Sequence, residues 1–222
     1  MDASSVAEEE VQLRKAWYAH QENGGGYAED EYTLSIYPWL SWDCWRGWSK
    51  LTVNNMVKAL KFLDRTNNTV ADLGAGIGLT TAQLAQMLPG TPIAYTNVPG
   101  PQTEVAKQIF AAAGVDQQIQ IILDRAPRAE TVLASELLEH ISAPIDYLAP
   151  HLVNCTTYVD ASSFTLESHG HMLKYEVDGE VVPREQMRRK LNKYLRAEGF
   201  TEMRKVGGAP KFWNNRPAVW MR

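Results

Sequence analysis

The chain has 222 residues, of which 45% are apolar and 22% are charged, and a chain of this kind can bury the core of a soluble α/β domain without disulfides. Its formal net charge of −4 supplies no global positive field, which argues against a nucleic-acid substrate without excluding one. There is no apolar run of membrane length, no secretory signal and no paired cysteine pattern, so we expect a cytoplasmic protein without membrane contact.

The first fifty residues form a distinct segment. Residues 6–20 resemble a short polar helix, and the glycines of 23–27 interrupt it. Tryptophans then recur every third residue, at Trp39, Trp42, Trp45 and Trp48. On an α-helix this step turns each ring by about 60° from the last, so the four rings do not form one flat stacking surface. Residues 51–64 predict a helix whose buried stripe is Val53, Met56, Val57, Leu60 and Leu63.

From residue 69 onward, strand and helix patterns alternate. We expect strands at 69–74, 92–98, 118–123, 131–138, 156–162, 200–206 and 217–222, and helices at 78–88, 102–114, 144–151 and 182–200. The basic residues of the last helix are expected to form a solvated face. Alternation followed by a terminal strand pair predicts an α/β fold: a three-layer, Rossmann-like sandwich with a mostly parallel seven-stranded sheet and a C-terminal antiparallel hairpin. Ligands of such sheets bind beyond the carboxyl ends of the strands.

The strongest local signal is the turn after the first strand. Asp72 is followed by Gly74, Gly76 and Gly78 and then by a helix, and such glycines permit a tight turn and a close backbone approach to a ligand. A dinucleotide fingerprint requires a small residue where Leu79 stands, and the Gly-Lys-Ser/Thr of a P-loop is absent. The carboxylate of Asp72 disfavours a pyrophosphate and favours a cationic ligand such as S-adenosylmethionine.

This stretch resembles the first motif of the Rossmann-like, class I S-adenosylmethionine-dependent methyltransferases. Three later pieces match the same family in order: "DRA" at 124–126, "ASELLEHI" at 134–141 and "LRAEGF" at 195–200. The resemblance covers roughly residues 50–222. It implies the following cofactor-binding residues: Asp72, Gly74, Ala75, Gly76, Gly78, Asn97, Asp124, Arg125 and Glu136. One departure is Asn97, which stands where the family carries an acidic residue for the ribose; an amide keeps the hydrogen bonds but loses about 1 kcal/mol of charge assistance.

Carboxylates and imidazoles gather after the fourth and fifth expected strands. Glu136, Glu139 and His140 lie at the end of the fourth strand, and His169 and His171 follow the fifth. The pattern E-x-x-E-H with a later His resembles quinone-precursor O-methyltransferases and small-RNA 2′-O-methyltransferases. That resemblance implies Mg²⁺ or Mn²⁺ ligands at Glu136, Glu139, His140 and either His169 or His171. A metal-free alternative stays open, in which the histidines serve as a general base or line the pocket.

These observations lead to one functional expectation and two alternatives. The resemblance implies a lid at residues 1–50 and an S-adenosylmethionine-binding domain at 51–222. We expect one or two of the four tryptophans to border the acceptor pocket and the others to pack on the sheet domain, with Arg46 near the cofactor carboxylate or the acceptor; packing of all four rings in the core stays open. The expected activity is methyl transfer to an oxygen of a small-molecule acceptor, with His140, His169 and His171 as catalytic candidates. An RNA methyltransferase and a non-catalytic binding subunit of the same fold remain alternatives, and a homodimer stays open.

Overall fold

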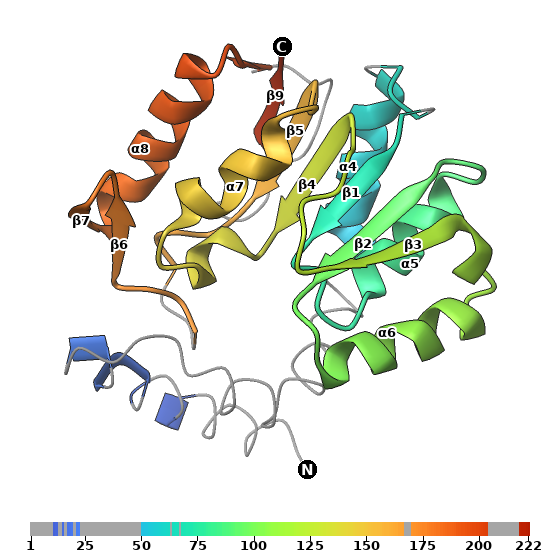
Figure 1. The fold of residues 1–222 in the computed structure, drawn as a ribbon, viewed down its shortest axis with the longest axis horizontal. Coiled ribbons are helices and arrows are strands. Elements are labelled where there is room, and N and C mark those ends of the chain that lie inside the picture. Colours follow the sequence, from blue (N-terminus) through green and yellow to red (C-terminus); the bar gives the residue numbers. More distant parts are fainter. Residues whose placement is uncertain are drawn as a thin grey trace.

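The computed structural model describes residues 11–12, 15, 17–19, 21–22, 50–62, 64–66, 68–166, 170–203 and 218–222. Within these ranges a central sheet is flanked by helices on both faces (Figure 1). The expected lid residues Trp39, Trp42, Trp45, Arg46 and Trp48, together with His169, lie outside the described residues. None of the helices in the described ranges is long and apolar enough to cross a bilayer.

The sheet has seven strands in the order β3-β2-β1-β4-β5-β9-β8. The strands are β1 (Val70–Leu73), β2 (Ile93–Asn97), β3 (Ile119–Leu123), β4 (Thr131–Ser135), β5 (Thr157–Ala161), β8 (Thr201–Glu202) and β9 (Ala218–Met221). The first five pair in parallel, and β9 runs antiparallel to both β5 and β8. The expected α/β class, the strand number and the late antiparallel pair are therefore confirmed.

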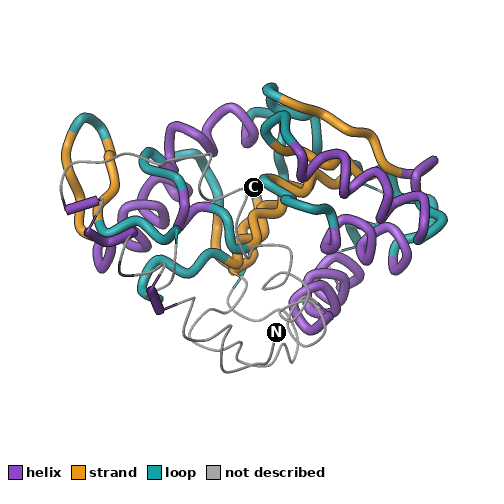
Figure 2. The backbone as a smooth tube through the Cα atoms, turned by 90° about the horizontal axis from the view of Figure 1, so that it is seen from below, coloured by secondary structure: helices purple, strands orange, loops and turns teal. Residues whose placement is uncertain are grey.

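Helices cover the two faces of the sheet in separate groups (Figure 2). One core cluster joins the sheet to α4 (Lys50–Phe62), α5 (Leu79–Met87) and α6 (Pro101–Ala112). The other joins it to α7 (Pro144–Leu152) and α8 (Arg184–Ala197). Because successive strand residues point to opposite faces, Tyr95 packs in the first cluster and Ala94 in the second. The three-layer arrangement follows from strands that are buried on both sides.

The connection between β3 and β4 contains no helix. β3 ends at Leu123 and β4 begins at Thr131, and residues 124–130 are bends and irregular chain. Parallel strands usually need a longer crossover with a helix that covers the sheet face. Here α7 and α8, which follow β4 and later strands, are the helices in the described ranges that cover this face.

Two local features differ from the sequence expectations. β4 stops at Ser135 rather than at 138, because Glu136 adopts a left-handed backbone (φ 49) that ends the strand, and a 3₁₀ helix, η3, follows at Leu138–His140. An additional hairpin, β6 (Lys174–Val177) and β7 (Glu180–Pro183), forms a second sheet. Its turn residues Asp178 and Gly179 both have positive φ, as a two-residue hairpin turn requires.

Candidate functional site

The glycine turn after β1, at the carboxyl edge of the sheet, has an open flank, which is the side of Gly76 that neighbouring atoms do not cover. Gly74, Gly76 and Gly78 all have positive φ (57, 53 and 78). A Cβ on Gly74 would lie 2.2 Å from Leu137 Cδ1, and one on Gly78 would lie 2.7 Å from the ring of Phe110. A Cβ on Gly76 would meet nothing closer than 3.9 Å. Gly74 and Gly78 are therefore needed for packing, whereas Gly76 presents bare backbone to open space, as a ligand-binding loop does.

Asp72, at the end of β1, lies beneath this turn rather than on its surface. Its side chain is 2% exposed, and Oδ2 accepts a 2.6 Å hydrogen bond from Thr81 Oγ1. Burial raises the pKa of Asp72 from 3.8 to about 6, and the bond from Thr81 opposes the rise. The carboxylate thus places negative charge below the glycine turn, next to the N-terminus of α5. Its predicted cofactor contact stays a prediction.

Asn97, at the end of β2, is tied to the glycine turn through its amide nitrogen. Nδ2 donates to the Gly76 carbonyl (3.2 Å), to Tyr95 Oη (2.9 Å) and to Gln102 Oε1 (3.3 Å). Tyr95 Oη also donates to the Gly76 carbonyl, at 2.5 Å. Three acceptors around one nitrogen fix the orientation of the amide. The amide oxygen is consequently the atom of Asn97 that suits a ligand hydroxyl.

Asp124 and Arg125 follow β3 at the same edge and are exposed. Asp124 has a left-handed backbone (φ 56), which is uncommon away from glycine and often accompanies a binding site. Both residues, with Asn97 and Val98, border a pocket of about 300 Å³. The far wall of this pocket belongs to α7.

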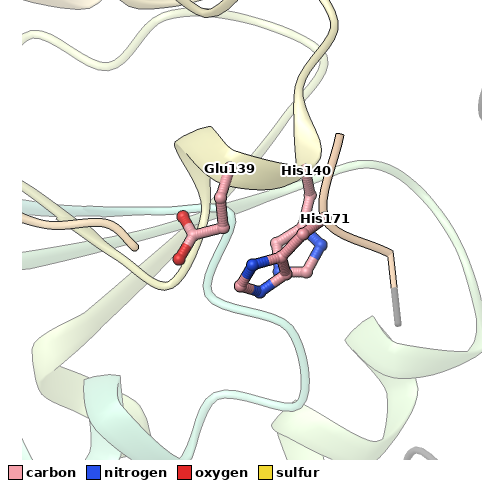
Figure 3. Close-up of side chains that lie close together, drawn as sticks. All are labelled: Glu139, His140 and His171. Carbon is pink, nitrogen blue, oxygen red and sulfur yellow. The ribbon is translucent and has the colours of Figure 1, made fainter. Parts of the chain in front are cut away.

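Glu139, His140 and His171 converge beyond β4 and β5 (Figure 3). One ligand atom of each lies within 4.8 Å of the others, and the two imidazole rings meet edge to face with centroids 4.7 Å apart. Glu139 is fully buried; its Oε1 accepts a 2.7 Å hydrogen bond from Ser163 N, and its buried Oε2 forms no geometrically sound hydrogen bond with any described residue. An orphaned carboxylate oxygen beside two imidazoles is a donor set that suits a divalent cation.

His171 is held by residues near the N-terminus, and the sequence did not connect these residues with the site. Its Nδ1 lies 2.8 Å from the Leu166 carbonyl, which makes Nδ1 the protonated nitrogen and leaves the ring lone pair on Nε2. Trp17 Nε1 (2.9 Å) and Gln21 Nε2 (3.0 Å) both donate to the His171 carbonyl, and Gln21 Oε1 accepts from Leu173 N (2.9 Å). The N-terminal helical residues therefore fix the loop that carries His171.

Glu136 lies beside this group but is not one of its three members. Burial, and then the charge of Glu139, raises the pKa of Glu136. Burial likewise raises the pKa of Glu139. Two buried carboxyls with raised pKa values favour a neutralising partner, and a cation bound at this site would supply it.

A buried ion pair lies directly behind these carboxyls. Asp160, at the end of β5, is fully buried and pairs with Arg188 of α8, whose side chain is 31% exposed. Arg188 also donates to the Ser162 carbonyl and lies over the ring of Phe164, 5.0 Å from its centroid. This inward contact corrects the expectation that the basic residues of α8 form only a solvated face. The pair holds the turn that presents Ser163 N to Glu139.

All these groups occupy one edge of the sheet, in the order of the strands. Asp124 follows β3, Asn97 ends β2, the glycine turn follows β1, and Glu136 and Glu139 follow β4. With neighbouring strands about 4.8 Å apart, β2 and β4 lie about 10 Å apart. An elongated ligand across the glycine turn could thus reach both ends of the site.

Comparison with known proteins gives matches in structure alone. No protein-family model and no curated protein matches the sequence. An O-methyltransferase family protein from Burkholderia thailandensis is 14% identical with a TM-score of 0.54, over 78% of this chain and 55% of that chain. Magnesium protoporphyrin IX methyltransferase from Synechocystis, solved with bound S-adenosylmethionine, is 18% identical with a TM-score of 0.53, over 77% and 78%. A putative RNA methyltransferase from Pyrococcus horikoshii is 14% identical with a TM-score of 0.50, over 77% and 79%.

This chain therefore spans little more than half the length of the Burkholderia protein. At these identities the similarity establishes architecture alone. The chain has the fold of the class I S-adenosylmethionine-dependent methyltransferases.

Proposed function

We propose that this protein is an S-adenosylmethionine-dependent methyltransferase that acts on an oxygen of a small-molecule acceptor. The observation that carries the proposal is the open flank of Gly76, set between Asn97 and the Glu139, His140 and His171 group on one sheet edge. The bound cofactor of the Synechocystis neighbour and the O-methyltransferase description of the Burkholderia neighbour support this choice of chemistry.

The residues of the chain suit the two ends of an elongated nucleoside donor. Asn97 Oδ1 can accept from a ribose hydroxyl, and Asp124 can accept from the exocyclic amine of adenine. The Gly76 backbone permits close approach in the middle, and Glu136 stands at the β4 end. S-adenosylmethionine, when bound, supplies an already activated sulfonium methyl group, so the protein has to align the acceptor rather than activate the donor.

We further propose a divalent cation, Mg²⁺ or Mn²⁺, on Glu139, His140 and His171. The orphaned Oε2 of Glu139 and the protonated Nδ1 of His171 fit this assignment. Such an ion would supply Lewis-acid stabilisation of an acceptor oxygen. In its absence, His140 and His171 are the candidates for taking a proton from the acceptor hydroxyl.

Calorimetric titration with S-adenosylhomocysteine tests the donor site without knowledge of the acceptor. We expect one binding event per chain, with affinity reduced at least tenfold in Gly76→Ala because the added methyl group fills the open flank. Gly90→Ala is the matched control, because Gly90 has a similar positive φ and open surroundings away from the site. No binding by the unmodified protein, or equal effects of the two substitutions, would refute the donor site.

Titration with Mn²⁺, followed by electron paramagnetic resonance, tests the cation site separately. We expect binding that Glu139→Gln weakens at least tenfold, whereas Glu176→Gln, at an exposed position on β6, leaves it unchanged. A protein that binds S-adenosylhomocysteine but not Mn²⁺ would eliminate the cation and leave the imidazoles as the proton acceptors.

RNA is the second candidate acceptor, because of the similarity to the Pyrococcus protein. A polyanion would bind through counterion release, so its affinity would fall steeply with salt. The acidic balance of the chain favours the small molecule. An affinity for single-stranded RNA that falls at least a hundredfold between 50 and about 200 mM salt would reverse this preference.

A further inference from the structure

A pocket lies beside the ends of β2 and β3, between the sheet and α7. Asn97, Asp124 and Arg125 line it at the strand ends, Ile122 lines it on the sheet, and Pro150 lines it on α7. Its volume is about 300 Å³, which is within the range of small-molecule sites. Residues 124–130 connect β3 to β4 without a helix, and the first three of them line the pocket.

The two sides of the pocket differ in chemistry. The strand ends carry the Asn97 amide, the Asp124 carboxylate and the Arg125 guanidinium. On the other side the pocket is lined by the apolar Ile122, by the ring of Tyr147 and by the exposed Pro150, with Asp146 and His151 beside them on α7. Thr96 also lines the pocket, and its hydroxyl already donates to the Asp72 carbonyl (3.1 Å). A matching ligand therefore has a polar heterocycle at one end and an apolar, preferably flat, group at the other.

None of the described residues that line the pocket on α7 is a lysine or an arginine, and Arg125 lines it at the strand ends. His151 is 8% exposed, and burial lowers its pKa, so its imidazole is neutral near pH 7. The wall from Asp146 to His151 on α7 runs for about 7 Å along the helix axis, which is long enough to lie against an aryl ring. The carboxylate of Asp146 on this wall disfavours an anionic substituent.

The pocket is too far from the Glu139, His140 and His171 group to hold the reacting end of the acceptor. It lies beside β2 and β3, whereas the Glu139, His140 and His171 group follows β4 and β5. β3 and β4 are three strand spacings apart, about 14 Å. The pocket is therefore continuous with the adenine end of the proposed donor site.

We propose that this pocket accepts a donor nucleoside whose adenine carries an apolar substituent on its exocyclic nitrogen. The proposal rests on the proposed function, because the adenine is placed by Asn97 and Asp124. A nitrogen with one substituent retains one N–H for the Asp124 carboxylate. The substituent then enters the space between Ile122 and α7, where it replaces water.

Calorimetric titration with S-adenosylhomocysteine and with its analogue bearing a benzyl group on the exocyclic nitrogen tests this proposal. We expect the two affinities to agree within about threefold. Pro150→Trp should narrow the α7 side of the pocket and weaken the benzyl analogue at least tenfold, while changing the affinity for the parent compound less than twofold. Pro89→Trp, at an exposed position after α5, is the matched control and should change neither affinity.

The outcomes separate this proposal from the one on which it rests. If the unmodified protein binds neither compound, the proposed function is wrong and this proposal falls with it. If it binds the parent compound but the benzyl analogue binds more than thirtyfold more weakly, the pocket does not accept the substituent. If both bind and Pro150→Trp affects them equally, the benzyl group lies elsewhere, and the proposal is overturned.

Discussion

Replacing Asp72 by Asn should stabilise the fold while impairing the donor site. The carboxyl is buried beneath the glycine turn, and its pKa is raised from 3.8 to about 6. A shift of about two pKa units corresponds to about 3 kcal/mol of destabilisation of the charged form. A neutral amide accepts a weaker hydrogen bond from Thr81, which offsets about 1 kcal/mol of the gain. The net expected gain in the free energy of unfolding is about 2 kcal/mol at pH 7.5.

The sign of the pH dependence follows from the raised pKa. The folded state holds the proton of Asp72 more tightly than the unfolded state, so the stabilisation is complete below about pH 3.8 and is lost as the pH rises to about 6. At pH 5 the folded carboxyl is already largely protonated, and the gain from Asp72→Asn falls to under about 1 kcal/mol. At pH 7.5 and above the gain should be constant.

Differential scanning calorimetry at pH 5 and pH 7.5 measures this difference. For a chain of this length, 2 kcal/mol corresponds to a Tm increase of about 4 to 8 °C, expected at pH 7.5 and much smaller at pH 5. Asp116→Asn, at an exposed position, is the control and should have little effect at either pH. A gain that is absent, or equal at the two pH values, would refute the burial argument. The same variant should bind S-adenosylmethionine less tightly, because negative charge near its sulfonium and ammonium groups is lost.

Further substitutions test packing and support. Gly74→Ala should prevent stable folding, judged by loss of cooperative thermal unfolding, because its Cβ would lie 2.2 Å from a leucine carbon; a Tm within 5 °C of the parent would contradict this. Arg188→Met should lower the free energy of unfolding in urea by about 2 to 3 kcal/mol, because it leaves Asp160 buried and unpaired; this figure is discounted for the partial exposure of the arginine. Adding Asp160→Asn should recover part of the loss. Purely additive effects of the two substitutions would be inconsistent with the ion pair. Trp17→Phe should weaken Mn²⁺ binding severalfold by releasing the His171 carbonyl, and an unchanged affinity would separate the N-terminal residues from the site.

Strand periodicity and glycine positions were sufficient to predict the sheet. The alternation from residue 69 onward determines which segments cross over in parallel, and the strand pairing confirms it. The β6–β7 hairpin was missed although Asp178-Gly179 carried the signal, a two-residue turn between short alternating segments. The end of β4 was misplaced because an apolar sequence continues past Ser135, and only the backbone reveals the left-handed Glu136.

The candidate site was only partly predictable, because several of its contacts join residues that are far apart in the sequence. Glu139 and His140 lie near each other because they are adjacent in sequence, and parallel strands bring their ends to one edge. The role of Trp17 depends on a contact with His171 across more than 150 residues, which no local pattern encodes. Arg188 belongs to a helix whose composition is that of a solvated surface, and its inward turn depends on Asp160. The pocket beside β3 has a wall from α7, which follows β4, so it too depends on a contact between distant segments.

A crystal structure with S-adenosylhomocysteine and Mn²⁺ tests the central claim most directly. The account predicts the ribose beside Asn97, the homocysteine chain across the open flank of Gly76, and the sulfur facing Glu136, with metal density between Glu139, His140 and His171. Density for the nucleoside away from the carboxyl edge of β1, β2 and β4 would contradict it.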